Sequence, residues 1–405
     1  MHRLAVYFAA ILSAQLIAPG ADVTLEGLRV RLGTPVQVTA QLGWEEGGHW
    51  AFIHATPTMA RFATGELIVT YTLVPDTNQN PKNGTGLQIS TDGGKTWGHR
   101  YEIIPEHQPM IFSPLSGNAL LAIPAYLYQR TPGDEHNFYA SYTRMEQGGR
   151  RIMFEPGAVK VVDWPWPVDV YKSVSPRSNW LAQLCFDGNA IEVNGHLLAT
   201  AYGTKKGEKF FRSVVLISED KGYTWRYHGT IADMSTVPPL PREGLEGPCE
   251  TSMIQLASGE LMAVFRVGSG KQFPLHRAYS RDGGRTWTRA DALPAYSVEP
   301  SLLRLRNGVI ALSSGRPDIR LWLSTDPRGA GWQDVDLLAH HNAWAPDPTY
   351  RIEPRPGYPA SSCYTEMVET APNKVLLVYD RGVRPRPQND RDLTRVFVMP
   401  IEVSR

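Results

Sequence analysis

An eight-residue motif, Ser-x-Asp-x-Gly-x-Thr-Trp, recurs three times in this chain, at Ser90–Trp97, Ser218–Trp225 and Ser280–Trp287. A degraded fourth copy stands at Ser324–Trp332. The aspartate can accept hydrogen bonds from the amides of a tight turn, the glycine can adopt a positive φ, and the tryptophan can pack beneath them. The motif therefore predicts a structural turn between two strands that the chain builds repeatedly.

A second, longer repeat gives the number of units. Each copy has a polar start, a short apolar strand, a turn and a second apolar strand. The copies begin at His54, Met110, Phe186, Cys249, Val298 and Cys363. Their turns are expected at Gly65, Gly117, Gly195, Gly259, Gly308 and Asn373. Repeated units of this kind predict a radial array in which each unit is one four-stranded blade, with the octapeptides of units one, three, four and five in the outer hairpins.

These repeats predict an all-β fold, a six-bladed β-propeller, in a single domain over residues 22–405. The early segment 35–42 or the late segment 394–403 is expected to complete a blade and close the ring. The unequal spacing follows if insertions such as 163–183 lengthen the loops on the faces. The alternative is a seven-bladed ring with one blade that the repeats do not reveal.

The composition excludes some classes of function. The 405 residues carry 41 Lys and Arg against 40 Asp and Glu, without the basic excess of a nucleic-acid-binding protein. Three cysteines, Cys185, Cys249 and Cys363, are too few for a disulfide scaffold. No Cys-x-x-Cys or His-x-x-x-His pattern indicates a metal, and we expect no cofactor.

The first 21 residues predict export. Two basic-type residues precede a short apolar run that ends near small residues and a proline, which is the layout of a secretory signal peptide. No later stretch is apolar enough to span a membrane. We expect a secreted or periplasmic monomer that acts on a glycan or oligosaccharide.

Polar residues at the ends of the repeated units are candidates for a site. In a propeller the innermost strands surround a central channel, so their leading ends meet on one face. The candidates are His54, Asp76, Asp187, Glu250, Arg266, Glu299, Arg316, Tyr364, Asp380 and Arg381.

These residues resemble those of the sialidase family, whose octapeptide is the Asp-box or BNR repeat. In that family one unit runs from a glutamate through a strand, a turn and a second strand to an arginine. Glu250 and Arg266 match this series. The next arginine is matched by Arg316, the tyrosine of the last unit by Tyr364, and the acid that closes that unit by Asp380. The resemblance covers most of the chain after residue 21.

The resemblance implies a retaining glycosidase. A Tyr364 nucleophile would attack the anomeric carbon after giving its proton to Glu250, one of the exceptions to the two-carboxylate rule. Arg266 and Arg316 would bind an acidic group on the sugar. Asp76 would protonate the leaving oxygen, and Asp187, Glu299 and His54 would contact the substrate.

One position departs from the family. The first arginine of the family's "Arg-Ile-Pro" triplet is replaced by Ala55, preceded by His54. Its partner acid, Asp380, is then expected to orient His54 instead, and the substrate could be a different acidic sugar or a neutral one.

Three other functions fit the same sequence. A propeller glycosidase of the exo-arabinanase type would use two of Glu250, Glu299, Asp187 and Asp76 as acid and nucleophile. A polysaccharide lyase would use Tyr364 or His54 as its base. A non-catalytic carbohydrate-binding propeller would explain the lost arginine.

Overall fold

The structure is a computed structural model of the chain. It describes residues 20–40, 54–72, 85–99, 101–103, 110–129, 133–169, 184–241, 243–353, 361–381 and 395–405. Within these ranges the strands form five sheets. No helix in the same ranges is long and apolar enough to cross a membrane.

Three sheets have four strands that pair in chain order. The first unit forms β4 (His54–Arg61), β5 (Leu67–Thr72), β6 (Thr85–Ser90) and β7 (Tyr101–Ile103). The fourth forms β17 (Leu245–Gln255), β18 (Leu261–Gly268), β19 (Pro274–Ser280) and β20 (Asp291–Tyr296). The fifth forms β21 (Val298–Arg304), β22 (Ile310–Gly315), β23 (Ile319–Ser324) and β24 (Gln333–Asp336). These units match the expectation of one four-stranded sheet each.

The second and third units share one nine-stranded sheet, which differs from the expectation. The second contributes β8 (Met110–Leu115), β9 (Ala119–Pro124), β10 (Tyr126–Gln129), β11 (Phe138–Glu146) and β12 (Arg151–Val162). The third contributes β13 (Leu184–Val193), β14 (His196–Gly203), β15 (Arg212–Ser218) and β16 (Thr224–Ala232). Because β12 pairs in parallel with β16, and β10 pairs with both β11 and β13, seven of these strands close on themselves.

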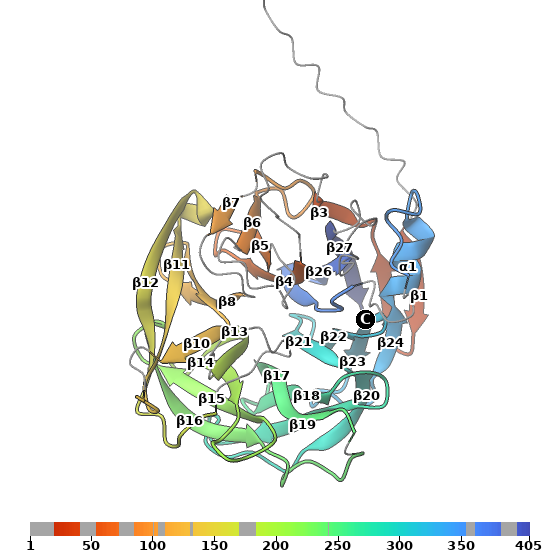
Figure 1. Cartoon of the computed structure of the whole chain (residues 1–405). Coiled ribbons are helices and arrows are strands. Elements are labelled where there is room, and N and C mark those ends of the chain that lie inside the picture. The colour runs from red at the N-terminus through yellow and green to blue at the C-terminus, as the bar shows by residue number, and fades with distance from the viewer. Residues whose placement is uncertain are drawn as a thin grey trace, which may run out of the picture.

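The last sheet joins the two ends of the described chain. It contains β25 (Glu366–Ala371), β26 (Lys374–Arg381) and β27 (Arg395–Ser404) from the C-terminal side. Both β2 (Leu28–Leu32) and β3 (Val36–Ala40) pair with β27, and β1 (Ala21–Leu25) pairs with β2. Figure 1 shows the red N-terminal strands beside the blue C-terminal ones. Both segments expected to close the ring therefore take part.

The sheets surround a central axis (Figure 1). The first strand of each unit contacts the first strand of the next, in the cycle β4, β8, β13, β17, β21, β25 and back to β4. The six expected turn residues all take a positive φ, between 67° and 110°. This is the radial arrangement that the repeats predict.

Buried apolar clusters fill the spaces between consecutive units. One packs the fifth unit against the last sheet, another the third against the fourth, and others occupy the remaining junctions. Strand β26 is almost wholly buried because both of its faces lie against neighbours, whereas β2 alternates buried and exposed residues. The core is therefore a circle of sheet-to-sheet contacts.

The octapeptides form the turn between the third and fourth strands of units one, three, four and five. In the third copy Asp282 accepts hydrogen bonds from the amides of Arg285 and Thr286 at 3.1 and 2.9 Å. The indole of Trp287 donates to the carbonyl of Gly284 at 2.9 Å. Antiparallel pairing puts these turns at the end of each sheet opposite the candidate site, which supports their structural role.

Within the described ranges, two helical segments interrupt the β structure. Helix α1 (Leu337–Trp344) follows β24, and Asp336 caps it by accepting a hydrogen bond from Ala339 N at 2.8 Å. The 3₁₀ turn η1 (Gln147–Gly149) joins β11 to β12 in the second unit, which lacks an octapeptide. All three cysteines are buried and free.

Candidate active site

Four of the innermost strands are interrupted at the same point. The pairing register with the next strand shifts part-way along each of them, which are β4, β13, β17 and β21. At these shifts the backbone takes a positive φ, at Thr56, Gly188, Glu250 and Glu299. Such bulges re-aim a side chain out of the regular alternation of the strand. The repeated bulge explains why charged residues gather at the start of apolar strands.

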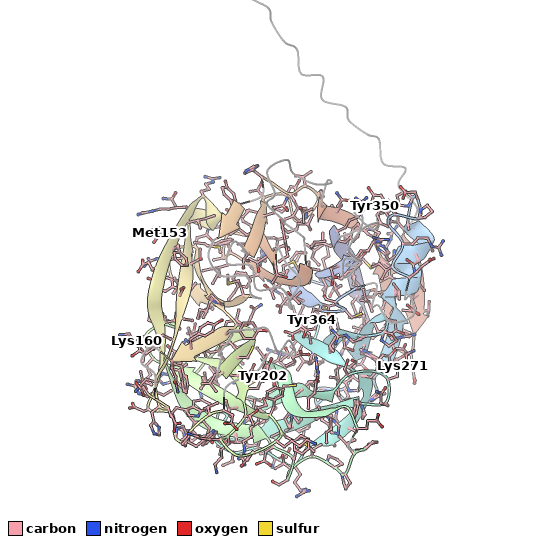
Figure 2. The ribbon with its side chains drawn as sticks, in the orientation of Figure 1. Met153, Lys160, Tyr202, Lys271, Tyr350 and Tyr364 are labelled. Atoms are coloured by element: carbon pink, nitrogen blue, oxygen red, sulfur yellow. The ribbon has the colours of Figure 1, made fainter. Side chains whose placement is uncertain are left out.

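Tyr364 and Glu250 are in direct contact. The hydroxyl of Tyr364 donates a hydrogen bond to Oε1 of Glu250, although Glu250 lies in β17 and Tyr364 in the segment just before β25. Figure 2 shows Tyr364 near the middle of the ring. The same Oε1 accepts from Arg266 Nη1 at 2.6 Å, and Oε2 accepts from the amide of Glu299 at 3.0 Å. Both oxygens of this carboxylate, which is 7% exposed, are therefore held.

The surroundings keep this pair as a carboxylate and a neutral phenol. Burial raises the pKa of Glu250, but the charge of Arg266 and the hydrogen bond from Tyr364 more than offset it, so the pKa lies below its ordinary value. Burial and the negative charge of Glu250 raise the pKa of Tyr364 well above 10. At neutral pH the proton therefore stays on the tyrosine and points at the carboxylate.

Arg266 lies between two carboxylates. Its Nη1 donates to Glu250 and its Nη2 to Glu246. Burial lowers the pKa of Arg266, but the nearby carboxylate of Glu250 raises it by more, so the guanidinium remains charged. Because both of its outer nitrogens are engaged, the side chain is fixed and holds Glu250 ionised.

Arg316 lies against the ring of Tyr364, with Cζ 5.9 Å from the ring centroid. Its Nη1 donates to Ser269 Oγ at 3.2 Å and its Nη2 to the carbonyl of Ser362 at 3.0 Å. Its Nε is buried and has no partner among the described residues. The guanidinium thus bridges loops of the fourth and last units beside the phenol.

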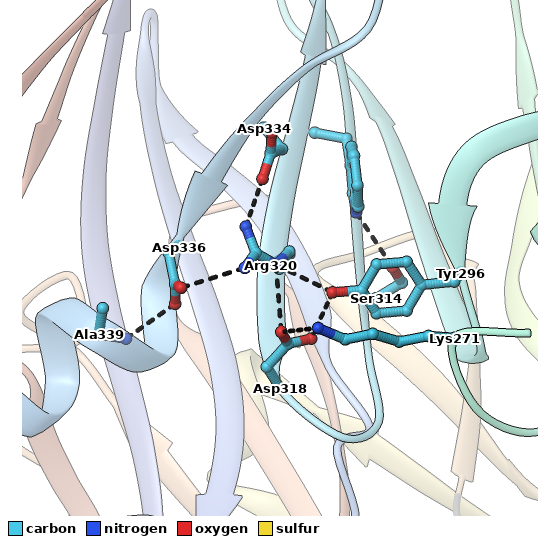
Figure 3. A network of polar contacts seen from close by, with 9 residues as sticks. Lys271, Tyr296, Ser314, Asp318, Arg320, Asp334, Asp336 and Ala339 are labelled. Atoms are coloured by element: carbon cyan, nitrogen blue, oxygen red, sulfur yellow. Dashed lines mark hydrogen bonds and ion pairs between the residues drawn. The ribbon is translucent and has the colours of Figure 1, made fainter.

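A polar network holds the loop that carries Arg316 (Figure 3). The amide of Arg316 donates to the carbonyl of Asp318 at 2.8 Å. The carboxylate of Asp318 accepts from Tyr296 OH at 2.7 Å and pairs with Lys271 and Arg320, each at 3.3 Å. Arg320 also pairs with Asp334 and Asp336 on β24. The position of Arg316 is therefore fixed by side chains from two sheets.

Asp380 holds the turn that leads into Tyr364. This buried carboxylate accepts from Ser362 N at 2.9 Å, from the Ser362 hydroxyl, and from Ser361 Oγ at 3.2 Å. These partners are serines of its own unit, and the expectation that Asp380 also orients His54 stays a prediction. The side chain of His54 lies outside the described residues.

Two more carboxyl groups, Asp187 and Glu299, lie close to this pair, and a third, Glu366, lies close to Glu299. Asp187 is 4% exposed, and its Oδ2 has no described partner. Burial, then the charges of Glu299 and Glu250, raise the pKa of Asp187 well above its ordinary value. Burial and Glu250 raise the pKa of Glu299 in the same way. Burial raises the pKa of Glu366 to about 8. These groups favour the protonated form and can donate a proton or hydrogen bond.

The structure thus brings together most of the residues that the sequence indicated. Asp76 lies outside the described residues. Sequence reasoning missed Glu246, Glu366, Ser269 and Ser362. Glu366 could have been found, because it stands two residues after Tyr364 and so shares its face of an extended segment. Among the described residues no group of three or more His, Cys, Asp or Glu side chains could hold a metal.

Comparison with known proteins places the chain among repeat proteins of this kind. A model of the family "BNR repeat-like domain" matches residues 163–370, and one of "BNR/Asp-box repeat" matches residues 88–97. A sialidase of Micromonospora viridifaciens is 23% identical over 248 residues, which are 57% of this chain and 35% of that protein. The match thus spans about a third of the relative's length.

Solved structures share the fold at low identity. A protein of unknown function from Dyadobacter fermentans superposes with a TM-score of 0.64 and 19% identity, over 94% of this chain and all of that one. A Hadza microbial sialidase gives 0.60 and 16%, over 92% and 68%. An α-L-arabinofuranosidase from Fusarium graminearum gives 0.59 and 12%, over 91% and 97%.

Proposed function

This chain belongs to the family of BNR repeat-like domains, in the sialidase superfamily, and we propose that it is a retaining exo-glycoside hydrolase with Tyr364 as nucleophile. The observation that carries the proposal is the hydrogen bond from the Tyr364 hydroxyl to Glu250 at the centre of the ring. A nucleophile that is hydrogen-bonded to a base held in place is the arrangement that covalent catalysis requires.

The proposed reaction has two displacements at the anomeric carbon. The Tyr364 oxygen bonds to that carbon while its proton passes to Glu250, and the bond to the leaving oxygen breaks. An acid protonates the leaving oxygen; Asp76 remains our prediction for it. Water then attacks the same carbon and gives a proton to the group that protonated the leaving oxygen, while the tyrosine oxygen departs and Glu250 returns the proton to it. Two inversions give net retention.

The two arginines support this chemistry by charge. Arg266 keeps Glu250 ionised and so able to accept the proton, and Arg316 lies beside the phenol where negative charge develops. The outer nitrogens of Arg266 both donate to carboxylates. An acidic sugar would therefore rely mainly on Arg316, and neutral terminal sugars belong in the first tests.

A second candidate is a glycosidase that uses two carboxyl groups. It is favoured by Asp187 and Glu299, which lie beside the ionised Glu250 and have raised pKa values. One of them would be the acid and Glu250 the nucleophile. The likeness in fold to an arabinofuranosidase supports this candidate as well.

We also propose that the sheets are six blades. Six first strands contact one another in a cycle, and buried clusters lie at each junction between units. The nine-stranded sheet would then be two blades joined by β10 and by the β12–β16 pairing. From the N-terminal sequence alone we propose export, and we propose that the protein acts as a monomer.

The test is turnover of fluorogenic α-sialosides, arabinosides and uronides by the wild-type protein and by Tyr364→Phe. We expect the substitution to lower kcat on the order of 1,000-fold, because phenylalanine keeps the ring and removes the attacking oxygen. Tyr101→Phe, at an exposed tyrosine on the opposite face, is the control and should change little.

Other outcomes separate the alternatives. If Tyr364→Phe retains activity and Glu299→Gln or Asp187→Asn abolishes it, the two-carboxyl mechanism replaces ours. If the wild-type protein binds glycans and turns over no substrate in the panel, the chain is a carbohydrate-binding propeller.

A further inference from the structure

A cavity of about 350 Å³ opens on the third unit, and none of the site residues described so far lines it. Its lining comes from the connection between β14 and β15 and from the turn after β16. Cys185 pairs with Tyr202, and Ser213 pairs with Ala232. This antiparallel register places the cavity at the same end of the sheet as Asp187, and therefore on the face of the candidate active site.

Phe211 connects this cavity with the centre of the ring. It lines the cavity and also packs in a cluster with Tyr202, Cys185 and Cys249, next to the catalytic strands. Its ring meets that of Tyr202 edge-on, with centroids 5.0 Å apart, and Figure 2 shows Tyr202 near the centre of the ring. Its amide donates to the carbonyl of Glu246 at 3.0 Å. Glu246 in turn binds Arg266, and Arg266 binds Glu250. Glu246 and Arg266 therefore link the wall of the cavity to Glu250.

The lining combines an aromatic surface with fixed polar groups. Lys209 Nζ stands 5.3 Å from the ring centroid of Phe210. The carboxylate of Glu208 accepts from Arg212 Nε and Nη2 at 2.8 and 2.7 Å, and Asp233 pairs with Arg212 Nη1 at 3.3 Å. Aromatic faces pack against the C–H faces of sugar rings, and oriented carboxylates and ammonium groups bond their hydroxyls.

We propose that this cavity binds a second sugar residue of the substrate, on the leaving-group side of the bond that is cleaved. The inference rests on the proposed exo-acting function: when the terminal sugar occupies the centre of the ring, the rest of the glycan must extend outward over the same face. The volume suits one or two neutral sugar residues, with Phe210 as the stacking surface and Lys209, Glu208 and Asp233 as hydrogen-bonding groups.

The test compares substrates that share a terminal sugar and differ in leaving group. The pairs are α-2,3-sialyllactose with the sialyl fluoride, and arabinotriose with the α-L-arabinofuranosyl fluoride, using whichever sugar is turned over. Phe210→Ala should lower kcat/KM about tenfold for the oligosaccharide, which corresponds to one lost stacking contact. It should leave the fluoride within about twofold, because a single leaving atom does not reach the cavity. Lys209→Ala, at an exposed side chain where folding is not at risk, should act in the same direction.

The matched control is Tyr101→Ala. It removes an aromatic ring from a cavity of about 280 Å³ beside the first octapeptide, on the opposite face, and should affect neither substrate. Equal losses for both substrates in Phe210→Ala and Lys209→Ala, or no loss in either, would overturn the proposal.

A binding measurement separates this proposal from the proposed function. Titration calorimetry of the oligosaccharide is carried out with the Tyr364→Phe protein, with and without Phe210→Ala, and the difference in affinity between the two proteins reports the contribution of the cavity without turnover. If the wild-type protein turns over no glycoside, the proposed function fails, and weaker binding after Phe210→Ala would still support the cavity. Unchanged binding after Phe210→Ala would overturn it.

Discussion

Asp380 holds the turn that positions Tyr364 in the site. Its carboxylate accepts hydrogen bonds from Ser361 and Ser362. The serine hydroxyls in turn accept from the amides of Cys363, at 2.8 Å, and Tyr364, at 3.3 Å. The same turn offers the Ser362 carbonyl to Arg316. One buried acid thus positions both the proposed nucleophile, Tyr364, and the cation beside it, Arg316.

This role predicts a pH dependence. Burial raises the pKa of Asp380 to about 6, against the opposing effect of its serine hydrogen bonds. Above that pH the group is an ionised acceptor of three hydrogen bonds, and below it the added proton removes acceptor capacity. We expect kcat/KM to fall as pH drops through about 6. Glu250 would give a limb at lower pH, since its pKa lies below the ordinary 4.5.

Asp380→Asn should lower kcat about tenfold, as the loss of a hydrogen bond to a charged group suggests, and should remove the limb near pH 6. The pH profile is the readout, and the melting temperature at pH 7 serves as the check on folding. A variant that keeps the limb would assign this titration to another group.

At the level of residues, the sequence predicted the site residues that recur at the same place in the repeated units. Glu250 and Arg266 bracket one hairpin, and Tyr364 begins another, so their order alone brought them to one face. Glu246 carries no such order, because it stands at the beginning of β17, ahead of the repeated series, and no motif marks its pairing with Arg266. The pairing of Asp380 with Ser362 was also missed, because the serines belong to a turn without a motif.

At the level of elements, the octapeptide turns differ in the number of hydrogen bonds that their aspartate accepts. Asp282 accepts four hydrogen bonds, from Ser280 Oγ, Arg285 N, Thr286 N and Thr286 Oγ1. Asp326 in the degraded copy accepts two, from the amides of Arg328 and Ala330. We expect Asp282→Ala to cost about 1–3 kcal/mol of unfolding free energy and Asp326→Ala less than about 1 kcal/mol.

Urea unfolding of the two variants measures this difference. Equal shifts of the midpoint would mean that the hydrogen bonds of the intact motif add nothing beyond those of its degraded form. A shift in the slope instead of the midpoint would indicate a changed unfolded state.

The sequence predicted elements well where their signal is local. Turns, hairpins and octapeptides are read from neighbouring residues, and the six turn residues have the positive φ that their positions required. The fusion of the second and third units was not predictable in this way. The parallel pairing of Lys160 with Thr224 joins residues far apart in the chain, and no periodicity in either segment records it.

At the level of the whole molecule, the last sheet joins both ends of the described chain. Strand β2 pairs with β27, with Val30 opposite Val403 and Arg31 opposite Glu402. Val30 is fully buried in the cluster between the fifth unit and the last sheet, whereas Arg31 is exposed. Together with the contact between β25 and β4, the pairing of these strands closes the row of sheets into a ring.

Because the ring is closed, we expect a loss of packing at this contact to lower the stability of all the sheets. Every first strand touches two others, so opening one junction removes support from both neighbours. Val30→Ala should lower the unfolding free energy by about 1–3 kcal/mol, and Arg31→Ser on the same strand by no more than about 0.5 kcal/mol. In urea, tryptophan fluorescence and far-UV circular dichroism should shift to the same lower midpoint in Val30→Ala, because a ring without a free edge unfolds as one unit. If the midpoints of the two signals differ, the last sheet unfolds before the others. The other sheets would then be shown to stay folded when the ring is open.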